Sequence, residues 1–142
     1  MEQNIEFLTK IYQNAKMGEE SIDPIINRTT NERLRQDLIT QKQGYVSLGK
    51  KAKTEIMRSN EKPKDLSPMT KYATKSMVKI NTMMNHTPTH IAKMMIQGST
   101  MGIIDAQECL HKYSSAQSCV KDLANEVLTF EQNNIERLKT YL

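Results

Sequence analysis

The sequence predicts an all-α protein, an up-down four-helix bundle of two antiparallel hairpins with a helical crossover between the second and third bundle helices. Its 142 residues are rich in Met, Lys, Glu, Gln and Leu and contain two Phe and no Trp, a composition that favours helices over sheets. Apolar residues recur every three or four positions in four long segments. Proline, serine and threonine separate those segments. A chain of this size is expected to form one domain, residues 1–142.

The two helices of the first hairpin are predicted at residues 3–26 and 30–58. Pro24 is expected to kink or stop the first helix near Asp23, because proline lacks an amide hydrogen and clashes with the preceding turn. Thr29 and Glu32 have the spacing of a capping box, which predicts Thr29 as the N-cap of the second helix. The apolar stripe of the second helix is predicted to comprise Leu34, Leu38, Gln41, Tyr45, Leu48, Ala52 and Ile56.

The crossover, residues 60–86, is predicted to hold a polar loop and a short helix that begins after the cap residue Ser67. Thr87 before Pro88 is the same signal and predicts a helix at residues 88–113. Serines at positions 114, 115 and 118 are expected to break the chain and cap a last helix at residues 117–141. Because the crossover can carry the chain back along the bundle, the third helix is expected to begin at the end where the second begins.

Polar residues interrupt the apolar stripes of the bundle helices. Glu19 lies on the first helix, Gln41 on the second and Asp105 on the third, and Glu131 and Asn134 lie on the last. A buried carboxylate costs on the order of several kcal/mol unless it is paired, so these side chains are expected to satisfy one another. Di-iron bundles use a Glu-x-x-His motif at this spacing, and here Asn134 stands where the histidine would be. We therefore expect no bound metal, with vestigial ligand positions at Glu19, Gln41, Glu131 and Asn134.

The run at residues 94–105, the tail at residues 131–142 and the two successive hairpins resemble short uncharacterised bacterial proteins of the ferritin-like superfamily. The resemblance covers nearly the whole chain and implies the ferritin-like fold. It would imply iron oxidation or storage only where the ligands match, and only Glu19 and Glu131 do. We predict a non-catalytic interaction or structural protein with a protein partner or self-association and no cofactor. The alternative is an iron-binding oxidoreductase or storage protein with unorthodox ligands.

Gly98 and Gly102 lie one turn apart in the third bundle helix. Their lack of a side chain predicts close packing against the last helix, around Phe130 or Tyr45. The alternative is a small cavity lined by Gly98, Gly102, Glu131 and Gln41. Six methionines are expected to pack in the core, although some could be displayed to a partner: Met77, Met83, Met84, Met94, Met95 and Met101.

The formal net charge of +4 is unevenly distributed along the chain. Residues 42–85 carry ten Lys or Arg and three Asp or Glu, whereas residues 1–41 carry five and seven, and residues 86–142 carry five and six. A solvated lysine surface is the expected role of this excess. Nucleic-acid binding through the basic crossover region is the second alternative function. The possible polyanion contacts are Lys50, Lys51, Lys53, Arg58, Lys62, Lys64, Lys71, Lys75 and Lys79.

No segment approaches the ~20 apolar residues that a membrane span needs, and the first residues lack the order of a signal peptide. We therefore expect no membrane association and a cytoplasmic location. Cys109 and Cys119 are expected to be free thiols, because two unpatterned cysteines suit a reducing compartment.

Overall fold

The computed structural model describes residues 2–142, with the side chains of residues 72, 76, 80, 83 and 84 excepted. The described residues form five α-helices and no strand, which confirms the all-α prediction. The helices are α1 Glu2–Ile26, α2 Glu32–Arg58, α3 Pro68–Met84, α4 Pro88–Lys112 and α5 Ser118–Lys139. In the part of the chain described, no helix combines the length and apolarity that crossing a membrane requires.

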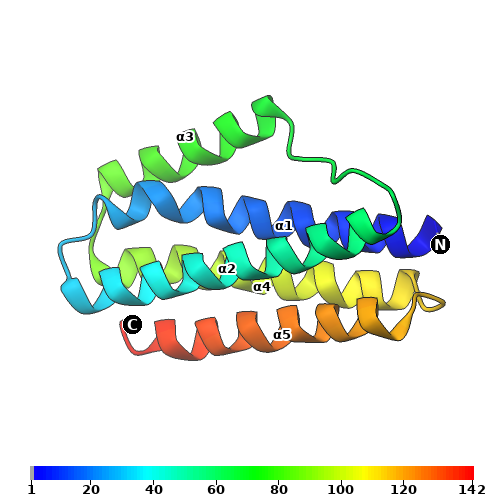
Figure 1. Cartoon of the computed structure of the whole chain (residues 1–142). Coiled ribbons are helices and arrows are strands. Elements are labelled where there is room, and N and C mark those ends of the chain that lie inside the picture. The colour runs from blue at the N-terminus through cyan, green and yellow to red at the C-terminus, as the bar shows by residue number, and fades with distance from the viewer. Residues whose placement is uncertain (1) are drawn as a thin grey trace.

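Two antiparallel hairpins, α1 with α2 and α4 with α5, form the bundle (Figure 1). The loop after α2 and helix α3 carry the chain back along the bundle, so α4 begins at the end where α2 begins. This is the course that the length of the crossover predicts. Helix α3 packs along α1 (Figure 1).

The apolar core consists of two clusters along the length of the bundle. One cluster centres on Phe7, Leu48 and Val120, and the other on Ile22, Leu38 and Leu138. All seven positions of the stripe predicted for α2 are buried. The periodicity of α2 therefore identifies its inward face correctly, including the polar position at its centre.

The start of α2 differs from the prediction, whereas α1 ends at Ile26 as its predicted range requires. Helix α1 does not stop near Asp23, and Pro24 lies within its last turn, where the missing amide costs the helix one hydrogen bond. The capping box at Thr29 is wrong. Asn31 is the N-cap of α2, and its side-chain oxygen accepts a 2.9 Å hydrogen bond from the Leu34 amide.

Helices α3 and α4 begin at side-chain caps, whereas α5 does not. The hydroxyls of Ser67 and Thr87 accept hydrogen bonds from the third residues of α3 and α4, at 3.1 and 3.2 Å, which confirms both predicted caps. The serine cap of α5 is wrong, because Gln117 is the N-cap and makes no side-chain cap bond. The backbone amide of Gln117 instead donates to the side-chain oxygen of Asn4 on α1 at 2.8 Å.

Replacing Asn31 with alanine is expected to lower the free energy of unfolding by about 1 kcal/mol, because the Leu34 amide loses its acceptor. Asn31→Asp retains an acceptor oxygen and is the matched control. Urea denaturation of the three proteins measures the difference. Equal stability of the alanine variant and the unmodified chain would contradict the assignment of the cap.

Candidate binding site

Among the described residues a single carboxylate lies inside the bundle, and three donors converge on one of its oxygens. Glu131 of α5 is 3% exposed. Its Oε1 accepts hydrogen bonds from the Tyr45 hydroxyl of α2 at 2.6 Å, the Ser99 hydroxyl of α4 at 3.2 Å and the Asn134 amide of α5 at 3.3 Å. We term these four residues the polar centre. Ser99 was not among the residues predicted to meet, although it is spaced by four from Met95 and by seven from Ala106 on the buried face of α4.

Burial and hydrogen bonding act on the polar centre in opposite directions. Burial raises the pKa of Glu131, and the hydrogen bonds from Tyr45, Asn134 and Ser99 partly offset that rise. Burial raises the pKa of Tyr45 well above its usual value, and the adjacent Glu131 carboxylate raises it further. Tyr45 therefore keeps its hydroxyl proton, and remains a hydrogen-bond donor, at neutral pH.

Glycines in α1 and α2 make room for the aromatic rings beside the polar centre. A Cβ atom on Gly18 would lie 2.6 Å from the Tyr45 ring, and one on Gly44 would lie 2.1 Å from the Phe130 ring. The two rings meet edge to face, with their centroids 4.9 Å apart. The close approach predicted around Tyr45 and Phe130 thus occurs at these two glycines and not at Gly98.

Gly98 and Gly102 of α4 have different surroundings. A Cβ atom on Gly102 would lie 2.1 Å from Oε2 of Glu131, so the carboxylate occupies the space over this glycine. A Cβ atom on Gly98 would meet nothing within 4 Å. The prediction of close packing is therefore wrong for Gly98. The alternative prediction, a cavity at this part of α4, is correct there.

A cavity of about 460 Å³ lies between α1, α3 and α4, and Gly98, Gly102 and Glu131 are among its lining residues. Tyr45 of α2 also lines it, whereas Gln41 does not. Most of the remaining lining is apolar, including five methionines from three helices: Met17, Met77, Met94, Met95 and Met101. The volume falls within the range of small-molecule sites.

The methionines only partly follow the prediction of core packing. Met95 is 7% exposed, whereas Met77 and Met101 are 62% and 56% exposed. The side chains of Met83 and Met84 lie outside the described residues. Methionine is flexible and polarizable, so a cavity lined by it can adapt to ligands of different shape.

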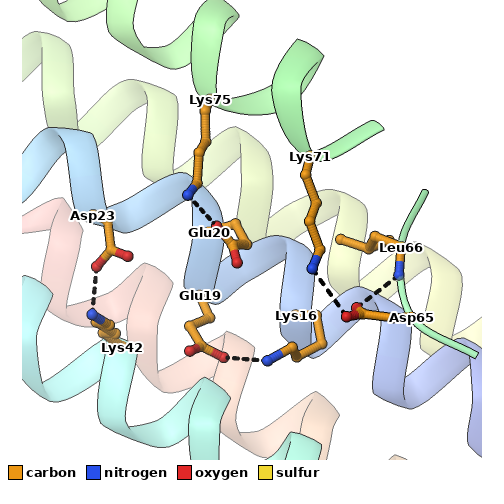
Figure 2. Close-up of polar contacts among 9 residues, drawn as sticks. All are labelled: Lys16, Glu19, Glu20, Asp23, Lys42, Asp65, Leu66, Lys71 and Lys75. Atoms are coloured by element: carbon orange, nitrogen blue, oxygen red, sulfur yellow. Dashed lines mark hydrogen bonds and ion pairs between the residues drawn. The ribbon is translucent and has the colours of Figure 1, made fainter. Parts of the chain in front are cut away.

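Glu19 does not join the polar centre. It is partly exposed and forms a 3.5 Å ion pair with Lys16 on its own helix (Figure 2). Gly18 lies against the Tyr45 ring and takes the inward position at this level of α1, which turns the next residue away. Gln41 is inward and only 4% exposed, but neither atom of its side-chain amide has a hydrogen-bond partner among the described residues. The mutual pairing expected of the four vestigial positions therefore holds only for Glu131 and Asn134.

The polar centre does not fit a di-iron group. Such a group needs carboxylates from several helices, and the polar centre has only the Glu131 carboxylate. Its Oε1 accepts from three neutral donors, and its Oε2 lies against Gly102. Within residues 2–142, apart from the five excepted side chains, no three His, Cys, Asp or Glu residues lie close enough to hold a metal ion.

The basic residues of the middle third are spread over α2, the following loop and α3, and four of the nine polyanion candidates form ion pairs. Lys51 pairs with Glu126 and Arg58 with Glu55. Figure 2 shows the other two pairs, which involve α3. Its Lys75 reaches Glu20 of α1 at 2.6 Å, and its Lys71 reaches Asp65 at 2.9 Å and lowers the pKa of that carboxyl. Of these two lysines, Lys75 therefore links α3 to α1, whereas Lys71 pairs with the loop that leads into α3.

Both cysteines are unpaired in the structure. Cys109 is half-buried and lines the cavity, and burial raises the pKa of its thiol. A thiol with a raised pKa is a weak nucleophile, because the thiolate is the reactive form. Cys119 is exposed at the start of α5.

These observations define an all-α protein with a buried polar centre and an adjoining apolar cavity. No protein-family model and no curated protein matches the chain. In structure the chain is similar to a DUF305 fragment from Deinococcus radiodurans, known from its crystal structure, with a TM-score of 0.77 and 12% sequence identity. The match covers 99% of this chain and 95% of that one. At this identity the likeness shows the fold alone.

Alanine substitutions at the two glycines of α4 are expected to have opposite effects. Gly98→Ala should raise the free energy of unfolding by about 0.5–1 kcal/mol, because alanine is the better helix former and its methyl group has space. Gly102→Ala should lower it by about 1 kcal/mol, since Oε2 of Glu131 must move while its Oε1 is held by three hydrogen bonds. Thermal denaturation of both variants measures the two shifts. Stabilisation by both substitutions would contradict the position of the carboxylate.

Proposed function

We propose that the chain is a ferritin-like bundle that has lost its metal site and works as a non-catalytic binding protein, with the cavity between α1, α3 and α4 as its binding site. The cavity is the observation that carries this proposal. Its volume suits a small molecule, and its lining is mostly apolar with a few polar groups, which is the usual composition of a ligand site.

The course of the chain supports the ferritin-like part of the proposal. Two antiparallel hairpins are joined by one long crossover that contains α3. The polar centre supports the loss of the metal site, because Tyr45, Ser99 and Asn134 supply the partners that a buried carboxylate needs. It offers no pair of carboxylates for metal chemistry.

The proposal is tested with N-phenyl-1-naphthylamine, an apolar dye whose fluorescence rises in apolar sites. We expect saturable binding of about one dye per chain. Gly98→Leu should weaken binding by about tenfold or more, because the new side chain enters the open space at Gly98. Gln107→Leu adds the same side chain at an exposed position of α4 that does not line the cavity, and should leave binding unchanged.

Equal dye binding by the Gly98→Leu and Gln107→Leu variants would place the dye elsewhere and overturn the proposal. Absence of saturable binding to the unmodified chain would do the same. Circular dichroism of each variant checks that its helix content is unchanged.

The iron-binding alternative remains a separate prediction with its own test. Elemental analysis of protein purified from iron-rich medium would support it by finding a stoichiometric metal, and that finding would overturn the proposed loss of the metal site. The nucleic-acid alternative requires binding at low salt, where phosphate contacts are strongest. A gel shift at low ionic strength that shows no complex would contradict it.

A further inference from the structure

The charged groups of the cavity favour a ligand of one sign. Three charged side chains are among its described lining residues, namely Lys10, Asp105 and Glu131. Lys10 is exposed, Asp105 is partly buried and accepts a 3.3 Å hydrogen bond from Asn14, and Glu131 is nearly inaccessible. The acidic groups outnumber the basic one, and the more buried positions are acidic.

The Glu131 carboxylate is held by neutral donors and has one oxygen unused. Tyr45, Ser99 and Asn134 all donate to Oε1, and no described side chain donates to Oε2. The ion pairs found among the described residues do not include Glu131. Donation of three hydrogen bonds favours the charged form of a carboxylate, and a buried charge is strongly stabilised by a counter-ion.

The missing side chains of Gly98 and Gly102 leave space on the α4 side of the cavity, next to this carboxylate. Gly98 has free space at the position of a Cβ atom, and Gly102 lies directly against Oε2. Both glycines line the same cavity as the methionines. An apolar chain in that cavity could therefore bring a terminal donor to Oε2 without displacing a side chain of α4.

We infer that the cavity binds a small amphiphile with an apolar chain and a protonated amine head, and that the amine pairs with the Glu131 carboxylate while the methionines contact the chain. This inference rests on the proposed function, because it names the ligand class of the same cavity. The ligand is a small molecule rather than a lysine of a partner protein, since Glu131 is only 3% exposed and the cavity volume suits a small molecule.

The test compares three probes of equal chain length by isothermal titration calorimetry at neutral pH: decylamine, decanol and decanoate. We expect decylamine to bind about tenfold to a hundredfold more tightly than decanol, because a hydrogen bond to a charged group contributes about 1.5–3 kcal/mol. Decanoate should bind least tightly. Glu131→Gln should remove the preference for the amine while decanol still binds. Glu108→Gln changes an exposed acidic residue of α4 that does not line the cavity, and this control should retain the preference.

The outcomes separate the inference from the proposed function. Binding of all three probes without a preference for the amine, or a preference for decanoate directed by Lys10, would overturn the inference and leave the proposed function standing. A preference that persists in Glu131→Gln would also overturn it. Failure of every probe to bind would overturn both. The comparison of probes on the unmodified chain remains decisive even where the Glu131→Gln variant does not fold.

Discussion

Replacing Gly44 with alanine is expected to lower the free energy of unfolding by about 1–3 kcal/mol, despite the better helix propensity of alanine. The new Cβ atom would lie 2.1 Å from Cε1 and 2.6 Å from Cζ of the Phe130 ring. That ring contacts Tyr45 edge to face, and the Tyr45 hydroxyl donates to Glu131. Moving Phe130 away from the new Cβ atom would therefore disturb its contact with Tyr45.

Gly49 provides the matched control on the same helix. A Cβ atom there would lie 3.7 Å from the Ala15 side chain, an ordinary van der Waals contact. Gly49→Ala should therefore raise the free energy of unfolding by about 0.5–1 kcal/mol. Urea denaturation of both variants measures the contrast. Equal stabilisation by the two substitutions would mean that α2 does not approach Phe130 as described.

Glycine is also the reason that sequence periodicity located only part of the polar centre. Periodicity identified the inward face of α2 and the inward positions Glu131 and Asn134 of α5. On α1 and α4 the inward residue that periodicity predicted is one position away from the one in the structure. Gly18 rather than Glu19 faces Tyr45, and Ser99 rather than Gly98 lies on the buried face of its helix. Gly18 can take an inward position because the Tyr45 ring from α2 fills its place, and a single sequence carries no record of that ring. Gly98 instead borders open space, so the inward position on α4 falls to Ser99.

The course of the chain was easier to predict than the helix caps. The polar loop with Pro63 and the Ser67 cap fixed the position of α3, and the short connections forced the hairpins. At the start of α2, Thr29 and Asn31 are both good N-cap residues. Thr29 is instead buried, at 1% exposed, so tertiary packing selects Asn31.

The substitution Glu131→Leu is expected to lower the free energy of unfolding by roughly 2–4 kcal/mol, because each buried donor left without an acceptor costs about 1–3 kcal/mol. Ser99 can rotate its hydroxyl toward the backbone of its own helix, but the Tyr45 ring is held between Gly18 and Phe130, so its hydroxyl cannot turn to another acceptor as easily. The Glu131→Gln variant keeps an acceptor for these donors and removes only the charge. Its stability should therefore exceed that of Glu131→Leu in urea denaturation.

The comparison of Glu131→Gln with the unmodified chain is expected to depend on pH. Burial raises the folded-state pKa of Glu131 above its usual value of 4.5. Between that value and the raised one, the folded chain binds a proton that the unfolded chain has lost, so stability falls as pH rises through this interval. Urea denaturation of both proteins from pH 4.5 to pH 8 should show the unmodified chain losing stability relative to the variant as pH increases.

The two Glu131 substitutions together distinguish a satisfied carboxylate from an unpaired one. A carboxylate without partners would make both substitutions stabilising at neutral pH, because each removes a buried charge. A carboxylate that serves as the acceptor for Tyr45, Ser99 and Asn134 makes the leucine variant the least stable of the three proteins at every pH. Only the glutamine variant can then be more stable than the unmodified chain, and only above the folded-state pKa of Glu131. Stabilisation by Glu131→Leu at neutral pH would therefore show that the polar centre is not held by these three hydrogen bonds.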